Sequence, residues 1–232
     1  DGSTRILRAF SGQYNGLWEV EGWAPPIFQV DTFNRIYADI EPRIKALGGG
    51  IAIQHRMAFQ GEYFVERYGA DEARITPPVA LMLQAGVPVG AGTDATRVAS
   101  FNPWVSLYWL TTGRTLGGLE LYPENNRLDR TKALELWTKG SAWFSCEDDR
   151  KGAIRAGEYA DLAVLSADYF SIPDEEIKNL YSVLTMVGGE IVHGDGGFND
   201  LAPPLPPASP DWSPVRSFGG HFHREAALAV PH

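Results

Sequence analysis

Asp94 is the residue whose position in this chain most suggests chemistry. It follows Val87–Gly92, a run of small, apolar and β-branched residues that predicts a strand buried on both faces. A carboxylate at the end of such a strand is costly to bury unless a metal, a cation or a substrate proton balances it. In parallel α/β barrels, catalytic groups lie at this end of the strands. We therefore predict that Asp94 is catalytic; the alternative is an aspartate that caps the following loop or helix.

Polar residues also end a second predicted strand, Ile51–His55. We expect His55 to lie at the same end of the sheet as Asp94, where it could line a substrate pocket. Gln54 could present its amide to a substrate. The alternative for His55 is a hydrogen-bonded structural residue, and we prefer that alternative slightly.

The loop after Asp94 supplies two further candidates for substrate contact, Arg97 and Asn102, because this loop would line the mouth of a barrel. His221 and His223 have the alternate spacing of a metal-binding pair on a strand. They lie in a Gly-rich tail near a single carboxylate, so we favour a surface tail. Ser141, Ser145 and Cys146 have no neighbouring histidine or other base, which argues against nucleophilic catalysis.

Strand, helix and strand in residues 51–92, with the helix at Pro78–Ala85, indicate a parallel βα repeat. A small β module follows the α/β body. The remaining predicted strands are at 27–30, 160–165, 182–187 and 190–193, with a hairpin turn at Gly188–Gly189 between the last two. The remaining predicted helices are at 34–47, 103–110 and 132–138, and Asp129 or Thr131 would cap the last of them.

Composition narrows the class of protein. The 232 residues carry a net charge of −9 without a Lys/Arg cluster, which excludes nucleic acid as a partner. No apolar run reaches the roughly 18 residues of a membrane span, so we expect no membrane partner. The single cysteine fits a reducing, cytoplasmic location. The first residues contain neither an initiator Met nor a secretion signal, which leaves open that the chain is processed or a fragment.

Four passages carry a family resemblance: residues 49–56, 85–95, 102–104 and 151–165. The last follows the pattern K-G-x-I-x-x-G-x-x-A-D, in which two glycines make turns and Asp161 bonds the turn. Together they resemble the amidohydrolase superfamily of metal-dependent hydrolases. The most similar branch is the amidohydrolase 3 group, which includes N-substituted formamide deformylase-like proteins.

The resemblance implies an α/β fold, the C-terminal part of a (β/α)₈ TIM-like barrel with an appended small β-sandwich module. The corresponding divisions are a poorly matched segment at 1–45, the last two barrel strands and their helices at 46–150, β-sandwich strands at 151–198, and a Pro-rich tail at 199–232.

The resemblance also implies a hydrolase that acts on amide-like, non-peptide C–N bonds of a small-molecule substrate. One or two divalent metal ions, commonly zinc, activate water in this family, and Asp94 would bind the metal and accept the proton from that water. Whether the protein forms a homo-oligomer is left open at this point.

The histidines of this chain limit what the resemblance implies. None of the five occupies the family's His-x-His position or its later histidine positions. The chain therefore resembles the last quarter to half of such an enzyme. The alternative function is a truncated, non-catalytic relic that serves as a binding or assembly module.

Overall fold

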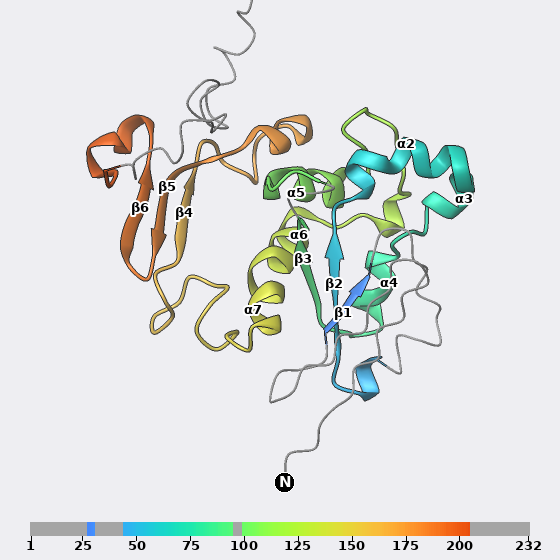
Figure 1. Ribbon diagram of the computed structural model, residues 1–232, viewed down its shortest axis with the longest axis horizontal. Helices are drawn as coiled ribbons and strands as arrows, with labels where there is room; N and C mark the ends of the chain where they lie inside the picture. Colours follow the sequence, from blue (N-terminus) through green and yellow to red (C-terminus); the bar gives the residue numbers. More distant parts are fainter. Residues whose placement is uncertain (1–26, 31–43, 95–98, 205–232) are drawn as a thin grey trace, which may run out of the picture.

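The computed structural model describes residues 27–30, 44–94 and 99–204, which form two three-stranded sheets with helices around them (Figure 1). The strands are β1 (Ile27–Val30), β2 (Gly50–Gln54), β3 (Val89–Gly92), β4 (Leu162–Leu165), β5 (Ser182–Val187) and β6 (Glu190–Gly194). The helices are α2 (Met57–Tyr68), α3 (Ala70–Ala73), α4 (Val79–Gln84), α5 (Pro103–Thr112), α6 (Arg130–Glu135) and α7 (Ser141–Phe144), with a π-helical turn η2 (Leu136–Gly140) between α6 and α7 and 3₁₀ turns η1 (Glu124–Asn126), η3 (Asp174–Asn179) and η4 (Gly196–Leu201).

The first sheet is parallel, in the order β1-β2-β3. Ile51 and Ile53 of β2 are almost completely buried, and they pair in register with Val89 and Ala91 of β3. Both residues of each pair are apolar, as expected for parallel strands that are covered on both faces. Helices α2 to α4 make the crossover from β2 to β3 (Figure 1). This sheet therefore forms the core that places the two strand ends side by side.

Helices η2 and α7 lie very close to β3 because glycines remove the side chains between them. A side chain at Gly90 would meet the Phe144 ring, 2.7 Å from its Cβ, and a side chain at Gly140 would overlap the carbonyl oxygen of Val89. The Ser141 hydroxyl donates a hydrogen bond to the Ala91 carbonyl at 3.0 Å. The contact thus fixes the distance between the helix and the strand that leads to Asp94.

The second sheet is antiparallel, with β5 in its centre. Gly188 and Gly189 make the β5–β6 turn with positive φ angles of 59° and 87°, which favour glycine. The Asp161 carboxylate accepts a hydrogen bond of 2.7 Å from the Gly188 amide. The predicted hairpin is confirmed. Asp161 was predicted to bond the turn of its own glycine motif, at 152–157, and instead bonds this hairpin turn.

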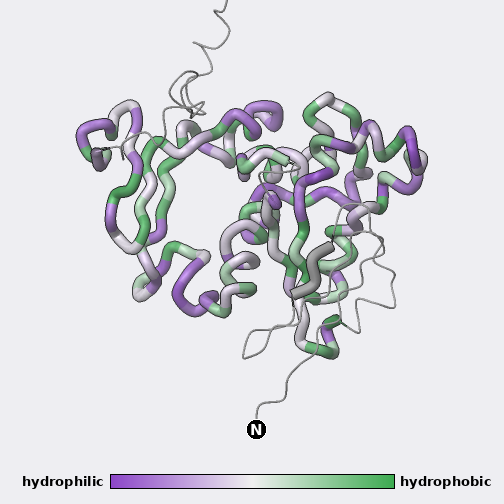
Figure 2. Tube along the Cα trace, in the orientation of Figure 1, coloured by the Kyte–Doolittle hydropathy of each residue, from purple (hydrophilic) through white to green (hydrophobic). Residues whose placement is uncertain are grey.

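The chain between β4 and β5 joins the second sheet to the first. Its residues Tyr169 and Ile177 are buried in the main hydrophobic core, where η3 packs on α5. Arg130 of α6 donates hydrogen bonds to the carbonyls of Tyr169 and Ile172. Hydrophobic segments follow the strands of both sheets in Figure 2, whereas the loop between α7 and β4 is largely hydrophilic.

Most predicted elements are confirmed, including all six strands, the helices at 78–85, 103–110 and 132–138, and the Asp129 cap, which accepts a 2.8 Å bond from the Lys132 amide. Helices α2 and α3 were missed, although the buried positions Met57, Gly61 and Phe64 have helical spacing. Of the helix predicted at 34–47, only residues 44–47 lie in the described part, and its last turn is helical there. The described residues form an α/β fold with three parallel strands and one antiparallel layer.

No helix within the described ranges is long and apolar enough to cross a lipid bilayer.

The contact between Gly140 and β3 gives a stability prediction. Gly140→Ala should lower the free energy of unfolding by about 1–3 kcal/mol, because the new methyl group overlaps backbone that cannot turn away. Urea unfolding followed by tryptophan fluorescence measures the change. Gly197→Ala is the control, because nothing lies within 4 Å of a side chain there. Equal stability of the two variants would contradict the prediction.

Candidate functional site

The carboxyl ends of β2 and β3 form the candidate site. Gln54 is paired in register with Gly92. Beyond this pair, β2 leads to Arg56 and β3 leads to Asp94. Each of these residues lies two positions beyond a paired residue, so the register brings them to the same place. Arg56 Nη2 is 3.3 Å from Asp94 Oδ2, in an ion pair with a hydrogen bond. The register of the two strands thus brings these two side chains into contact at the edge of the sheet.

Asp94 is held in an unusual backbone conformation. Its φ is 51°, a left-handed value that aspartate tolerates better than most residues. The side chain is 40% exposed, so the expectation of a buried charge is wrong. Its charge is balanced by a cation, the guanidinium of Arg56, whose side chain is 15% exposed. The left-handed turn thus directs the carboxylate toward solvent at the point where β3 ends.

Gly92, two residues before Asp94, leaves open space beside this strand end. A Cβ placed on Gly92 would have no atom within 4 Å, in contrast to Gly90 in the same strand. A side chain at Gly92 would therefore meet open space among the described residues, two positions before Asp94.

His55 is completely buried immediately after β2, beside the ring of Phe59 (centroid distance 5.3 Å). Its Nε2 lies 3.0 Å from the carbonyl oxygen of Ser100, so Nε2 carries the proton and donates it to that bond. Nδ1 then holds a lone pair, and it is buried without a hydrogen-bond partner in the described part of the chain. Burial lowers the pKa of His55 to about 4, against a smaller opposing effect of the Ser100 bond. The imidazole is therefore neutral at physiological pH.

Asn102 starts helix α5. Its Oδ1 accepts a 2.9 Å hydrogen bond from the Trp104 amide, with Pro103 at the first helical position. The Asn102 amide in turn donates to Ser100 Oγ at 3.1 Å. His55, Ser100 and Asn102 thus form a series of hydrogen bonds that fixes the chain after Asp94 to the end of β2.

The structure places the predicted site residues as follows. Gln54 and His55 are buried at the same strand end as Asp94, and Asn102 is tied to it through Ser100. Their contact with a substrate stays a prediction. Arg97, His221 and His223 lie outside the described residues.

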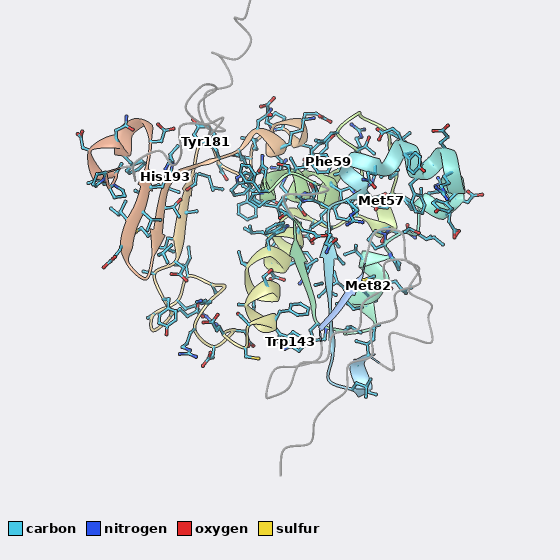
Figure 3. The ribbon with its side chains drawn as sticks, in the orientation of Figure 1. Met57, Phe59, Met82, Trp143, Tyr181 and His193 are labelled. Carbon is cyan, nitrogen blue, oxygen red and sulfur yellow. The ribbon has the colours of Figure 1, made fainter. Side chains whose placement is uncertain are left out.

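The remaining polar residues that the sequence draws attention to have structural partners. His193 lies in strand β6 of the antiparallel sheet, apart from Met57 and Phe59, which follow β2 (Figure 3). Ser141 bonds to backbone carbonyls, and Cys146 is exposed with a free thiol. The sequence interpretation missed Arg56 as a site residue, although the predicted parallel pairing of 51–55 with 87–92 contained the signal for it.

The fit of a metal ion to these residues is partial. The Asp94 carboxylate is an oxygen ligand of the type that divalent metals bind, and it faces solvent. Among the residues that the structure describes, no three His, Cys, Asp or Glu side chains come together as a metal site. The described strand ends therefore offer the Asp94 carboxylate as an oxygen ligand.

Comparisons with known proteins identify the family to which this chain belongs. Residues 4–193 match the sequence profile of the Amidohydrolase family. The N-substituted formamide deformylase of Arthrobacter pascens is 29% identical over 150 residues, which make up 63% of this chain and 27% of that protein. This chain therefore spans about a quarter of the length of that curated relative.

Two solved structures share the fold. Atrazine chlorohydrolase TrzN from Arthrobacter aurescens TC1, complexed with zinc, matches with a TM-score of 0.55 and 18% identity over 78% of this chain and 37% of that one. An uncharacterized metal-dependent hydrolase from Pyrococcus horikoshii OT3 matches with a TM-score of 0.53 and 20% identity, over 65% of this chain and 30% of that one.

The buried imidazole gives a prediction for acid stability. Between pH 6.5 and about 4 the unfolded chain binds a proton at residue 55 that the folded chain does not, so the free energy of unfolding falls as the pH falls. Each unit of pKa difference corresponds to about 1.4 kcal/mol, so His55 lowers the free energy of unfolding by about 3 kcal/mol at most. Urea unfolding at several pH values in this window measures it.

His55→Gln should make that decline shallower, because glutamine can donate to the Ser100 carbonyl but does not titrate. His193→Gln, which keeps His55, is the matched control. An unchanged decline in His55→Gln would refute the assignment to His55.

The cap on α5 gives a second prediction. Asn102→Ala should lower the free energy of unfolding by about 1 kcal/mol, because the Trp104 amide loses its acceptor. Asn102→Asp keeps an acceptor and should stay close to the wild type. Thermal and urea unfolding of both variants measure the difference; a fully stable alanine variant would show that the cap is energetically unimportant.

Proposed function

Because this chain belongs to the amidohydrolase family, we propose that the protein is a metal-dependent hydrolase of amide-like, non-peptide C–N bonds. The observation that carries the proposal is the solvent-facing Asp94 carboxylate at the carboxyl end of a buried parallel strand. In this proposal, residues 46–150 form the closing part of a (β/α)₈ barrel and residues 151–198 contribute β-sandwich strands. The shared fold with two larger structures supports it.

Asp94 has two roles in the proposed reaction. It is an oxygen ligand of a divalent metal, and it accepts the proton released when water attacks the amide carbon. A bound divalent ion, zinc by analogy with the chlorohydrolase structure, would make that water more acidic and polarise the amide carbonyl.

The other residues at this edge orient the substrate in the proposed site. Gln54 presents a side-chain amide next to the end of β3, and Arg97 belongs to the loop that follows Asp94. His55 and Asn102 hold the start of α5 and thereby the far side of that loop. These residues bind and position a small molecule, while proton transfer is assigned to Asp94.

The substrate class follows from the relative and from the charge of the chain. The matching protein from Arthrobacter pascens is an N-substituted formamide deformylase, so N-substituted formamides are the first substrates to test. The net charge of −9 favours a small molecule over nucleic acid.

One observation favours a second candidate function, a binding or assembly module without catalysis. Within the described ranges, no three His, Cys, Asp or Glu side chains come together in a way that could hold a metal ion. Metal analysis together with light scattering distinguishes the two: a metal-containing active protein supports the hydrolase, and a metal-free, inactive oligomer supports the module.

Asp94→Asn tests the hydrolase directly. It should lower kcat/KM for formate release from N-substituted formamides by about a hundredfold or more, because the neutral amide neither accepts the proton nor binds a cation well. It should also lower the content of bound metal, measured by mass spectrometry of the purified protein.

Asp161→Asn is the matched control for this substitution. It makes the same chemical change at the exposed hairpin turn and keeps the oxygen that accepts from Gly188. Wild-type turnover in Asp94→Asn would disprove the catalytic assignment.

A further inference from the structure

We propose that His55 and Arg56 are positioning residues, which together hold Asp94 in the orientation in which it accepts a proton. The inference rests on the proposed function, because it takes Asp94 as the proton acceptor of the hydrolase. It goes beyond that function by assigning the orientation of Asp94 to two consecutive residues at the end of the neighbouring strand.

The backbone of Asp94 is the first observation. Its φ of 51° lies in the left-handed region, which is less stable for a residue with a side chain than extended or helical backbone. A residue keeps such a conformation only where the surrounding structure holds it there. In the described part of the chain, the end of β2 supplies contacts of this kind at Asp94 itself and at Ser100, six positions further on.

His55 and Arg56 lie at a rigid junction between β2 and α2. The His55 carbonyl accepts a 3.0 Å hydrogen bond from the Ala58 amide. The Arg56 carbonyl accepts one of 3.0 Å from the Phe59 amide. Met57, the first residue of α2, is completely buried. Both side chains therefore extend from backbone that is fixed by a strand on one side and by a helix on the other.

The two side chains attach to opposite ends of one segment, residues 94–100. Arg56 Nη2 lies 3.3 Å from Asp94 Oδ2, where β3 ends. His55 Nε2 lies 3.0 Å from the Ser100 carbonyl oxygen. The Ser100 hydroxyl in turn accepts a hydrogen bond from the Asn102 amide, where α5 begins. Because both contacts restrain the same segment, the loss of either one releases Asp94 from its orientation.

The test compares kcat and KM for formate release from N-substituted formamides with amide hydrogen exchange at the start of α5. His55→Leu removes the bond to Ser100. It should lower kcat about tenfold and change KM less than about twofold, because a displaced base still leaves substrate binding intact. Exchange of the Asn102 and Trp104 amides should become about tenfold faster, because the segment before them loses its attachment to β2.

Conservative variants separate positioning from packing. His55→Gln keeps a donor for the Ser100 carbonyl and should restore kcat. Arg56→Gln should lower kcat about three- to tenfold, whereas Arg56→Lys keeps the charge and should retain most of it. The double variant of His55→Leu and Arg56→Gln should lose little more than His55→Leu alone, because both contacts act on one segment.

His193→Leu is the matched control for His55→Leu. His193 Nε2 makes the same type of contact in the antiparallel sheet, 3.2 Å from the Ser182 carbonyl oxygen. The control should leave kcat and exchange at the start of α5 unchanged. Urea unfolding establishes that each variant is folded. If His55→Leu is unfolded, Ser100→Ala takes its place, because it removes the acceptor of the Asn102 amide without changing a core residue.

The outcomes separate the positioning role from the proposed function. A lower kcat with faster exchange in His55→Leu, both restored in His55→Gln, supports the positioning role. Wild-type kcat or wild-type exchange in folded His55→Leu, with Asp94→Asn inactive, overturns the positioning role and leaves the hydrolase in place. Full activity of Asp94→Asn, or no hydrolysis by the wild type, overturns the proposed function and the positioning role with it.

Discussion

The parallel pairing of β2 with β3 is the constraint on which the other features depend. The pairing is fixed by apolar residues buried on both faces, because a shift of one residue would turn Ile51 and Ile53 away from their present neighbours. Gly90 and Gly140 then let the η2–α7 segment lie directly against β3. Buried packing in the middle of the sheet thus decides which charged residues meet at its edge.

The polar groups at this strand end differ in their exposure to water: one charged pair is partly exposed, and one imidazole is buried. The Asp94–Arg56 pair stays partly in water, where a separated charge costs little. His55 is fully buried and neutral, with one nitrogen bonded to Ser100. The charged pair keeps contact with water, whereas the buried bond ties Ser100 to the end of β2.

The second sheet depends on the first through α5 and α6. Tyr108 of α5 donates to the Glu175 carboxylate, and Lys178 of η3 lies 4.5 Å from the centre of the Tyr108 ring. Arg130 bonds to the connection before η3. Helix α5 begins at Asn102, whose position depends on Ser100 and His55. The strand end and the antiparallel sheet are thus linked through α5, with a second link from α6.

Local sequence patterns predicted much of this arrangement. The strand before Asp94, the helix start at Asn102–Pro103 and the hairpin at Gly188–Gly189 depend on neighbouring residues, so a single sequence can reveal them. The Arg56–Asp94 contact depends on the pairing of two strands 38 residues apart, which no local pattern specifies. The exposure of Asp94 was wrongly predicted because Asp94 lies two residues past the last paired residue of β3, in a left-handed backbone conformation. Packing of η3 on α5 likewise depends on tertiary contacts alone.

Gly92 has a consequence for how such a protein can diverge. Its backbone is not in the left-handed region, and no atom of the described residues lies within 4 Å of the missing side chain. The other residues of this strand are buried or closely packed, so most substitutions there cost stability. Position 92 is free of that penalty among the described residues, although it is two residues from the carboxylate. A sequence can therefore vary beside Asp94 while the fold stays the same.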